Sequence, residues 1–126
     1  MVIPVKVKEI VYDVMMNPVV LLLDENELKA LPIWIGPFEA HAIALALEGI
    51  DLERPLTHDL LKIFCERMDA RLSMVLISDV REGTYYAELH LWHHKNELVI
   101  DSRPSDAIAL ALRTQAPAPR PSLAGA

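Results

Sequence analysis

The chain has 126 residues, of which 52% are hydrophobic, and it carries a formal net charge of −6 at pH 7. A chain of this length can form one domain that buries roughly two thirds of its unfolded surface without disulfides or a structural metal. The single cysteine, Cys65, excludes an intrachain disulfide and is typical of a reducing compartment, and the scattered lysines and arginines argue against tight nucleic-acid binding through a basic patch.

The sequence also argues against a membrane protein. It has no run of about eighteen apolar residues that would cross a bilayer, and residues 1–17 lack the long apolar stretch and cleavage site of a signal peptide. We therefore expect a cytoplasmic protein with no membrane partner.

The first half of the chain predicts three strands followed by a helix. The strands are expected at residues 2–12, 19–23 and 31–35. Gly36-Pro37 is a typical helix start, because proline is favoured at the first helical position, and Gly49 is a typical helix end. Glu39 would then lie in the first helical turn, where a carboxylate meets the positive end of the helix dipole.

A second helix is expected from Thr57, which is a good N-cap residue, with Asp59 in its first turn. Its buried face is predicted from the apolar residues at helical spacing, which are Leu60, Leu61, Phe64, Cys65 and Met68.

The second half repeats the plan of the first. A hairpin of residues 71–80 and 84–92 around Glu82-Gly83 is followed by a strand at 97–101 and by a third helix that starts at Pro104. The domain is expected to cover residues 1–117, and residues 118–126, which are rich in alanine and proline, are expected to form a flexible tail.

An internal repeat supports this plan. Ala-Ile-Ala-Leu-Ala-Leu occurs at residues 42–47 and again at 107–112, and Asn-Glu-Leu precedes each copy, at 26–28 and 96–98. We therefore predict an α+β fold: a single domain with three helices and two β-rich halves of the β-β-β-α type, related by internal duplication.

Polar side chains gather at the three predicted helix starts. They are Glu39 at the first, Arg54, His58 and Asp59 at the second, and Asp101, Arg103, Ser105 and Asp106 at the third. Backbone N–H groups point outward at a helix start, so these positions suit an anion or an oriented carboxylate. The structural alternative is that Asp59 and Asp106 act as helix caps and that Arg103 pairs with Asp106.

Four segments carry a resemblance to a known family. They are LPIWIGPFEAHAIALALEG (31–49), RPLTHDLL (54–61), EGTYYAEL (82–89) and IDSRPSDAIALALR (100–113). Together they resemble the bifunctional nuclease family over about residues 1–117. The resemblance implies cleavage of both RNA and DNA, nucleic acid as substrate and assembly into a homo-oligomer.

On this resemblance, the polar residues at the helix starts occupy the family's recurrent positions, and phosphodiester hydrolysis suggests a role for each. Glu39, His58, Asp59 and Asp101 would be catalytic, with His58 as general acid or base. Arg54, Arg103 and Ser105 would bind phosphate. Glu39, Asp101 and Asp106 would hold a divalent metal, Mg²⁺ or Mn²⁺.

Two other functions remain open from the sequence. The same helix starts would suit a non-catalytic module that binds a phosphorylated ligand or a protein partner, or the chain could be an oligomeric scaffold. An enzyme needs two or more carboxylates near a common point, whereas a binding module needs only the arginines there.

Overall fold

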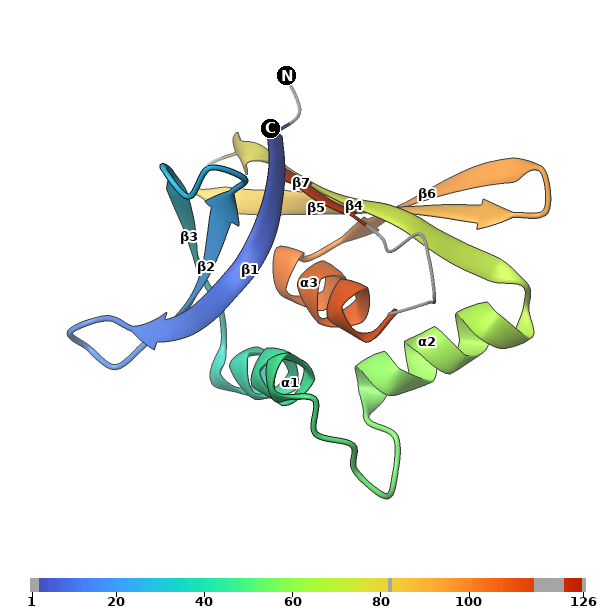
Figure 1. Cartoon of the computed structure of the whole chain (residues 1–126), viewed down its shortest axis with the longest axis horizontal. Helices are drawn as coiled ribbons and strands as arrows, with labels where there is room; N and C mark the ends of the chain where they lie inside the picture. Colours follow the sequence, from blue (N-terminus) through green and yellow to red (C-terminus); the bar gives the residue numbers. More distant parts are fainter. Residues whose placement is uncertain (1–2, 82, 115–121, 126) are drawn as a thin grey trace.

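A computed structural model of the chain describes residues 3–81, 83–114 and 122–125. The elements in chain order are β1 (Ile3–Tyr12), β2 (Pro18–Asp24), β3 (Ala30–Trp34), α1 (Pro37–Glu48), α2 (Thr57–Arg67), β4 (Ala70–Arg81), β5 (Thr84–His93), β6 (Asn96–Ser102), α3 (Pro104–Arg113) and β7 (Ser122–Gly125). A curved sheet lies along one side of the molecule, and the helices lie together on its other side (Figure 1). None of the helices within the described ranges has the length and apolar character needed to cross a membrane.

The strands form one sheet in the order β3-β2-β1-β7-β4-β5-β6. Strands β1 to β3 form an antiparallel meander that leads into α1, and β4 to β6 form a second meander that leads into α3. Ile43 of α1 and Ile108 of α3, which occupy equivalent places in the two repeats, are both 0% exposed. The predicted α+β domain with two β-β-β-α halves and three helices is therefore confirmed for the described residues.

Strand β7 joins the two halves of the sheet. It pairs antiparallel with β1 and parallel with β4. The prediction of a flexible tail over residues 118–126 is therefore wrong for Ser122–Gly125, because their backbone groups are paired within the sheet. Residues 118–121 and 126 lie outside the described residues.

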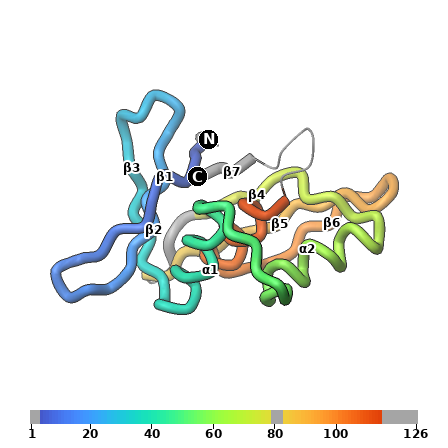
Figure 2. Tube along the Cα trace, turned by 60° about the horizontal axis from the view of Figure 1, so that its bottom comes forward, coloured from blue at the N-terminus to red at the C-terminus, as the bar shows by residue number. Residues whose placement is uncertain are grey.

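Helices α1 and α3 start and end as the sequence predicts. Gly36 is the N-cap of α1, Pro37 is its first residue, and Gly49 ends it with φ 66°, a left-handed conformation that glycine adopts without strain. Pro104 is the first residue of α3. The two helices pack against each other, and the tube in Figure 2 shows them side by side in the centre of the molecule.

Helix α2 differs from the prediction at its start. Its N-cap is Leu56 rather than Thr57. The backbone N–H of Leu56 donates a hydrogen bond to the Asp59 carboxylate at 2.8 Å. A side chain three residues into the helix thus satisfies this N–H, and Thr57 begins the helix itself.

The predicted buried face of α2 is also wrong. Leu60, Leu61, Phe64 and Met68 are 44, 41, 62 and 61% exposed, and Cys65 is only partly buried. The buried residue of this helix is His58. The helix therefore turns His58, Asp59 and the partly buried Cys65 toward the rest of the protein. It leaves an apolar stripe, made by Leu60, Leu61, Phe64 and Met68, largely exposed, and Leu61 of this stripe also lines a cleft beside the helix.

The hydrophobic core lies between the sheet and the helices. Val20 and Leu22 come from one half of the sheet, Val75 and Ile77 come from the other, and the two repeated helices meet them from below. Because α1 and α3 share this core, their N-terminal ends are held in fixed positions relative to β5 and β6.

Candidate functional site

A cleft of about 970 Å³ lies where the three helices meet the ends of β5 and β6. Residues from α1 and α2 form two of its walls, and Asp106 and Leu110 of α3 lie between them. The predicted site residues that line it are Glu39, His58, Asp101, Arg103 and Asp106. Five of the eight predicted residues, from four separate segments, are thus brought to one concave surface.

Asp106 is bonded to two of these residues, His58 and Arg103, and we call the three together the His58–Asp106–Arg103 cluster. His58 Nε2 lies 2.9 Å from Asp106 Oδ1. Arg103 donates from Nε to Asp106 Oδ2 at 2.9 Å and from Nη2 to Oδ1 at 3.2 Å. The predicted pairing of Arg103 with Asp106 is confirmed, and the same carboxylate also links α3 to α2 through His58.

The charges of the cluster support one another. Partial burial by itself would raise the pKa of Asp106, but the hydrogen bonds from Arg103 and His58 outweigh it, so this pKa lies below its ordinary value. The hydrogen bond to Asp106 raises the pKa of Arg103. Asp106 is therefore a carboxylate, and Arg103 a cation, at neutral pH.

The histidine keeps one ring nitrogen available. His58 Nδ1 has no hydrogen-bond partner in the described part of the chain, where every buried side-chain nitrogen or oxygen has one. His58 lines the cleft, although its side chain is only 11% exposed.

Glu39 and Asp101 lie beside this cluster. The Glu39 carboxylate folds back over Gly36, where a Cβ atom would collide with it, so glycine at the start of α1 leaves the space that this side chain occupies. Its charge acts on Arg103 and helps to raise the pKa of that residue, after the larger effect of Asp106. Asp101, near the end of β6, is exposed at the rim of the same cleft.

Ser105 lies in a neighbouring hollow rather than in the cleft. This hollow, of about 340 Å³, shares Glu39 and Arg103 with the cleft and lies on the side of β3 and Gly36. Ser105 itself is 7% exposed. Ser105 is therefore not among the residues that line the cleft.

Asp59 faces away from the cleft and has a structural role. Its carboxylate accepts the backbone N–H of Leu56 and a hydrogen bond from Arg113 Nε at 2.8 Å. Arg113 also donates to the backbone carbonyls of Ala109 and Ala42, so one guanidinium connects all three helices. Burial alone would raise the pKa of Asp59, but these hydrogen bonds lower it.

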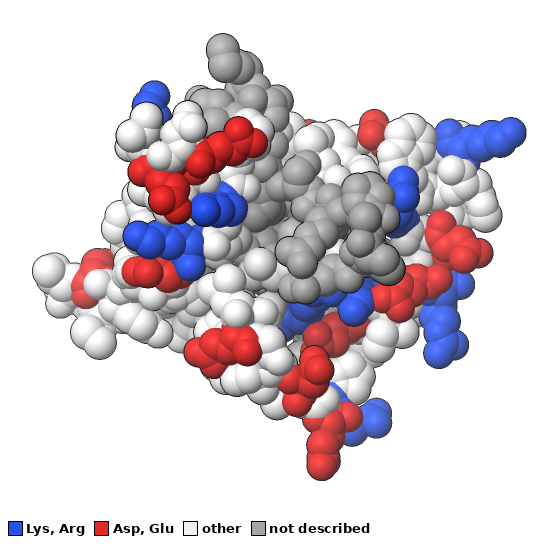
Figure 3. Space-filling view, in the orientation of Figure 1, with Lys and Arg blue, Asp and Glu red and all other residues white. Residues whose placement is uncertain are grey.

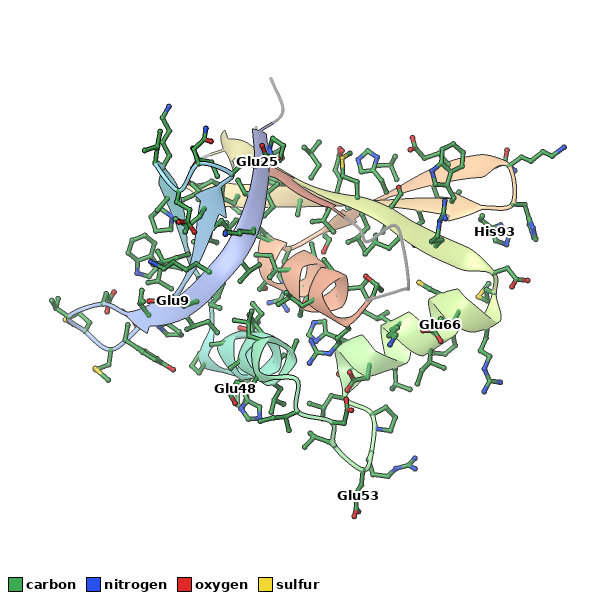
Figure 4. The ribbon with its side chains drawn as sticks, in the orientation of Figure 1. Glu9, Glu25, Glu48, Glu53, Glu66 and His93 are labelled. Atoms are coloured by element: carbon green, nitrogen blue, oxygen red, sulfur yellow. The ribbon has the colours of Figure 1, made fainter. Side chains whose placement is uncertain are left out.

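Arg54 is also outside the cleft. It lies in the exposed loop between α1 and α2 and is absent from the cleft lining. Its neighbour Glu53, labelled in Figure 4, lies at the tip of this loop, on the side away from the sheet.

The described residues do not form a metal site from protein ligands alone. No three His, Cys, Asp or Glu side chains among them are placed to hold a metal ion. Glu39, Asp101 and Asp106 are therefore not drawn together as a three-ligand site in the described residues. Both oxygens of Asp106 accept hydrogen bonds from Arg103 and His58 instead. Glu39 and Asp101 are the two carboxylates that remain beside the cleft for a cation.

The surface around the site carries charges of both signs. On the face shown in Figure 3, lysines and arginines alternate with aspartates and glutamates and form no continuous basic stripe over the described residues. Among the cleft residues themselves, Arg103 is the single arginine or lysine, beside three carboxylates. Phosphate recognition in the cleft would therefore depend on one cation.

Sequence reasoning missed two kinds of residue. Arg113 is at the end of the second repeat, and its connecting role needs the packing of three helices, which no local pattern reveals. Phe38 and Tyr85 line the cleft beside the charged residues. Phe38 directly follows Gly36-Pro37 and lies in the first turn of α1, whereas the buried residues of this helix come later. A large aromatic residue at a helix start, before the buried residues, is the signal that could have revealed it.

The family model that matches the chain and the named plant relatives refer to the same family. The family model of the bifunctional nuclease domain matches residues 20–119. An uncharacterized protein of Mycobacterium tuberculosis is 44% identical over 101 residues, which cover 80% of this chain and 60% of that protein. Bifunctional nuclease 1 of Oryza sativa subsp. japonica is 30% identical over 104 residues, which cover 80% of this chain and 31% of the rice protein. Bifunctional nuclease 2 of Arabidopsis thaliana is 28% identical over 104 residues, which cover 80% of this chain and 32% of the plant protein. The chain thus spans less than two thirds of the length of these relatives, and the match over residues 20–119 includes the whole cleft: the chain belongs to the bifunctional nuclease domain family.

Proposed function

We propose that the chain is a nuclease that hydrolyses phosphodiester bonds of RNA and DNA with low sequence specificity. Membership of the bifunctional nuclease domain family supports the reaction class. The observation that carries the proposal is the His58–Asp106–Arg103 cluster, which places a proton-transfer group and a cation on one wall of an open cleft.

In this proposal, His58 moves protons. With Nε2–H donating to Asp106, the neutral ring presents the Nδ1 lone pair to the cleft. Nδ1 accepts a proton from water while the water oxygen attacks phosphorus, and the P–O bond to the leaving oxygen breaks. The leaving oxygen then takes up a proton from the imidazolium or from solvent. Asp106 fixes the ring and stabilises its charged form, as a carboxylate does in a catalytic triad.

Arg103 stabilises the negative charge that develops on the phosphoryl oxygens. A guanidinium has five N–H donors, and Arg103 uses its Nε–H and one Nη2–H for Asp106. The remaining N–H groups would donate to a substrate phosphate. The ion pair with Asp106 holds the guanidinium in place and occupies only part of its donors.

A divalent cation would be held by Glu39 and Asp101 together with the substrate. Mg²⁺ and Mn²⁺ are commonly held by one or two carboxylates plus water and phosphate oxygens, so a three-ligand protein site is not needed. Such an ion would neutralise phosphate charge at the cleft. The two carboxylates contribute the ligands, and Gly36 leaves room for that of Glu39.

Self-association of the chain is part of the proposal. The apolar stripe of α2 is fixed toward solvent, because His58 and Asp59 on the other side of the helix are bonded to α3. Exposed apolar surface of this extent, on the order of several hundred Å², is characteristic of an interaction site. A second copy of the chain, packed on the same stripe, is the occupant that we propose, since a twofold interface buries such a patch in both copies at once.

The experiment is cleavage of single-stranded RNA and DNA in the presence of Mn²⁺ by the intact chain and by Glu39→Ala and Asp101→Ala. We expect both substitutions to abolish cleavage while the melting temperature stays within a few degrees, because both carboxylates lie at the rim of the cleft. Glu53→Ala at the loop tip is the matched control and should cleave normally (Figure 4). Cleavage that survives both alanine substitutions would show that these carboxylates take no part in the reaction, whereas no cleavage by the intact chain would favour a binding module.

A further inference from the structure

Side chains with aromatic rings line the cleft beside its charged residues. Phe38, the second residue of α1, lines the cleft and is 86% exposed, so it has no role in the core. His41 lies one turn later on the same helix face and also lines the cleft, and half-buried Tyr85 comes from β5. A phenylalanine kept in water at the rim of a concave site is apolar surface that a ligand would cover.

The charges of the cleft favour few phosphate contacts. Arg103 is its single arginine or lysine, and Glu39, Asp101 and Asp106 surround it. The whole chain carries a net charge of −6. Double-stranded nucleic acid offers mainly its phosphate backbone, and its binding depends on many cations that neutralise phosphates. This cleft lacks them, so affinity has to come from the bases.

Base contact requires an unpaired nucleotide. In a duplex, each base face is covered by its neighbours in the stack, whereas an unpaired base can lie against an aromatic side chain. The cleft volume of about 970 Å³ is at the upper end of the range of about 300–1,000 Å³ for sites that enclose drug-sized ligands, so a nucleotide fits in it.

We propose that the cleft selects single-stranded RNA or DNA, with one unpaired base against Phe38 and the adjoining phosphate at Arg103. This assignment of the substrate class rests on the proposed nuclease function of the same cleft. Low sequence specificity follows from it, because every base offers the same kind of face to an aromatic ring.

The test is the affinity of the intact chain for a fluorescein-labelled 12-nucleotide DNA strand and for its blunt duplex, measured by fluorescence anisotropy in EDTA so that no cleavage occurs. We expect the single strand to bind at least tenfold more tightly than the duplex. Its affinity should fall with salt with a slope of log K against log[salt] of about −0.7 for each phosphate contacted, hence near −1 for one or two contacts.

The variant Phe38→Ala tests the role of the ring. We expect the single strand to bind about 5- to 150-fold more weakly, the range that corresponds to loss of one stacked base. Tyr12→Ala, a ring truncation at a tyrosine that is 58% exposed at the end of β1 and outside the cleft lining, should leave the affinity unchanged. Because Phe38 is 86% exposed, its truncation should not unfold the chain, which a thermal melt verifies.

Three results would overturn this inference: equal affinity for strand and duplex, unchanged affinity of Phe38→Ala, or no binding of either DNA at 100 µM protein (roughly the weak limit of non-specific DNA binding). The nuclease proposal fails separately, if the single strand binds selectively in EDTA but is not cleaved when Mn²⁺ replaces EDTA. Conversely, cleavage that is equal on strand and duplex and indifferent to Phe38→Ala would retain the nuclease and reject the selection of single strands.

Discussion

Asp106 is the residue on which the candidate site depends most. It accepts hydrogen bonds from His58 on α2 and from Arg103 at the start of α3, so it serves both the fold and the proposed chemistry. Asp106 can therefore have a structural role and a catalytic role at once. Its hydrogen bond with His58 holds α2 to α3 and also orients the histidine ring. Asp59, by contrast, is bonded to Arg113, and neither residue lines the cleft.

The lowered pKa of Asp106 predicts how its contribution to stability changes with pH. Its pKa in the folded chain lies below the ordinary value of 3.8, so its stabilising contribution is complete above that value and is lost as the pH falls through the lower, folded-state pKa. Asp106→Asn should thus melt at a lower temperature than the unchanged chain at pH 7, and the gap should close toward pH 3. Thermal melts between pH 7 and pH 3 measure this. A gap that stays constant over the whole range would contradict the ionic role, and Asp51→Asn in the exposed loop is the control.

At the scale of elements, α2 shows how long-range contacts override local patterning. Its sequence has apolar residues at helical spacing, which ordinarily predict a buried face. The ion pairs of its first turn, His58 with Asp106 and Asp59 with Arg113, instead fix the polar side inward. The sequence contains the apolar residues and the polar residues of α2, but it does not show that Asp106 and Arg113 of α3 lie next to its first turn. The orientation of α2 could therefore not be predicted.

Arg113 is expected to be the most important polar side chain for helix packing. Its side chain is 8% exposed and bonds Asp59 and the backbone carbonyls of Ala109 and Ala42. Removing one partner of a buried pair costs about 3–5 kcal/mol, so Arg113→Ala should lower the free energy of unfolding by about 3 kcal/mol, toward the lower limit because Asp59 remains partly exposed to water. Urea unfolding monitored by circular dichroism measures the change. Arg67→Ala, an exposed arginine in the last turn of α2, should change it by less than about 0.5 kcal/mol, and equal effects of the two substitutions would refute the connecting role.

The stripe of α2 predicts the behaviour of the chain in solution. If two copies pack through Leu60, Leu61, Phe64 and Met68, light scattering at micromolar concentration should give a mass of about twice 14.1 kDa. Phe64→Glu should give the monomer mass, because two buried carboxylates would face each other or the apolar stripe. Leu28→Glu, at a leucine that is 81% exposed in the turn after β2, is the control and should not change the mass. A monomer mass for the unchanged chain would reject the interface.

At the scale of the whole molecule, the duplication explains what could be predicted. Gly36-Pro37, Gly49 and Pro104 set the helix limits by local chemistry, and the repeated hexapeptide identified the two equivalent helices before their contacts were known. Because both repeats pack into one core, polar residues at their starts come to one surface, which is why Glu39, Arg103 and Asp106 were found together.

The features that the sequence did not predict depend on contacts between residues that are distant in the chain. The pairing of β7 with β1 and β4 joins the two ends of the chain and has no local signal in an alanine- and proline-rich segment. Arg54 and Ser105 share the residue types of the site but do not line the cleft, because polarity near a helix start does not determine where a side chain lies.

We propose that the His58–Asp106–Arg103 cluster cleaves phosphodiester bonds. The most direct measurement is the single-turnover cleavage rate of a labelled single-stranded 20-mer by the intact chain and by His58→Asn, with thermal melts of both. His93→Asn, at the far end of the β5–β6 hairpin, is the matched control (Figure 4). Loss of a general acid or base typically costs a factor of about 10² to 10⁴, so we expect a loss of at least about 100-fold for His58→Asn and none for His93→Asn. A folded His58→Asn chain that cleaves at the unchanged rate would contradict the account.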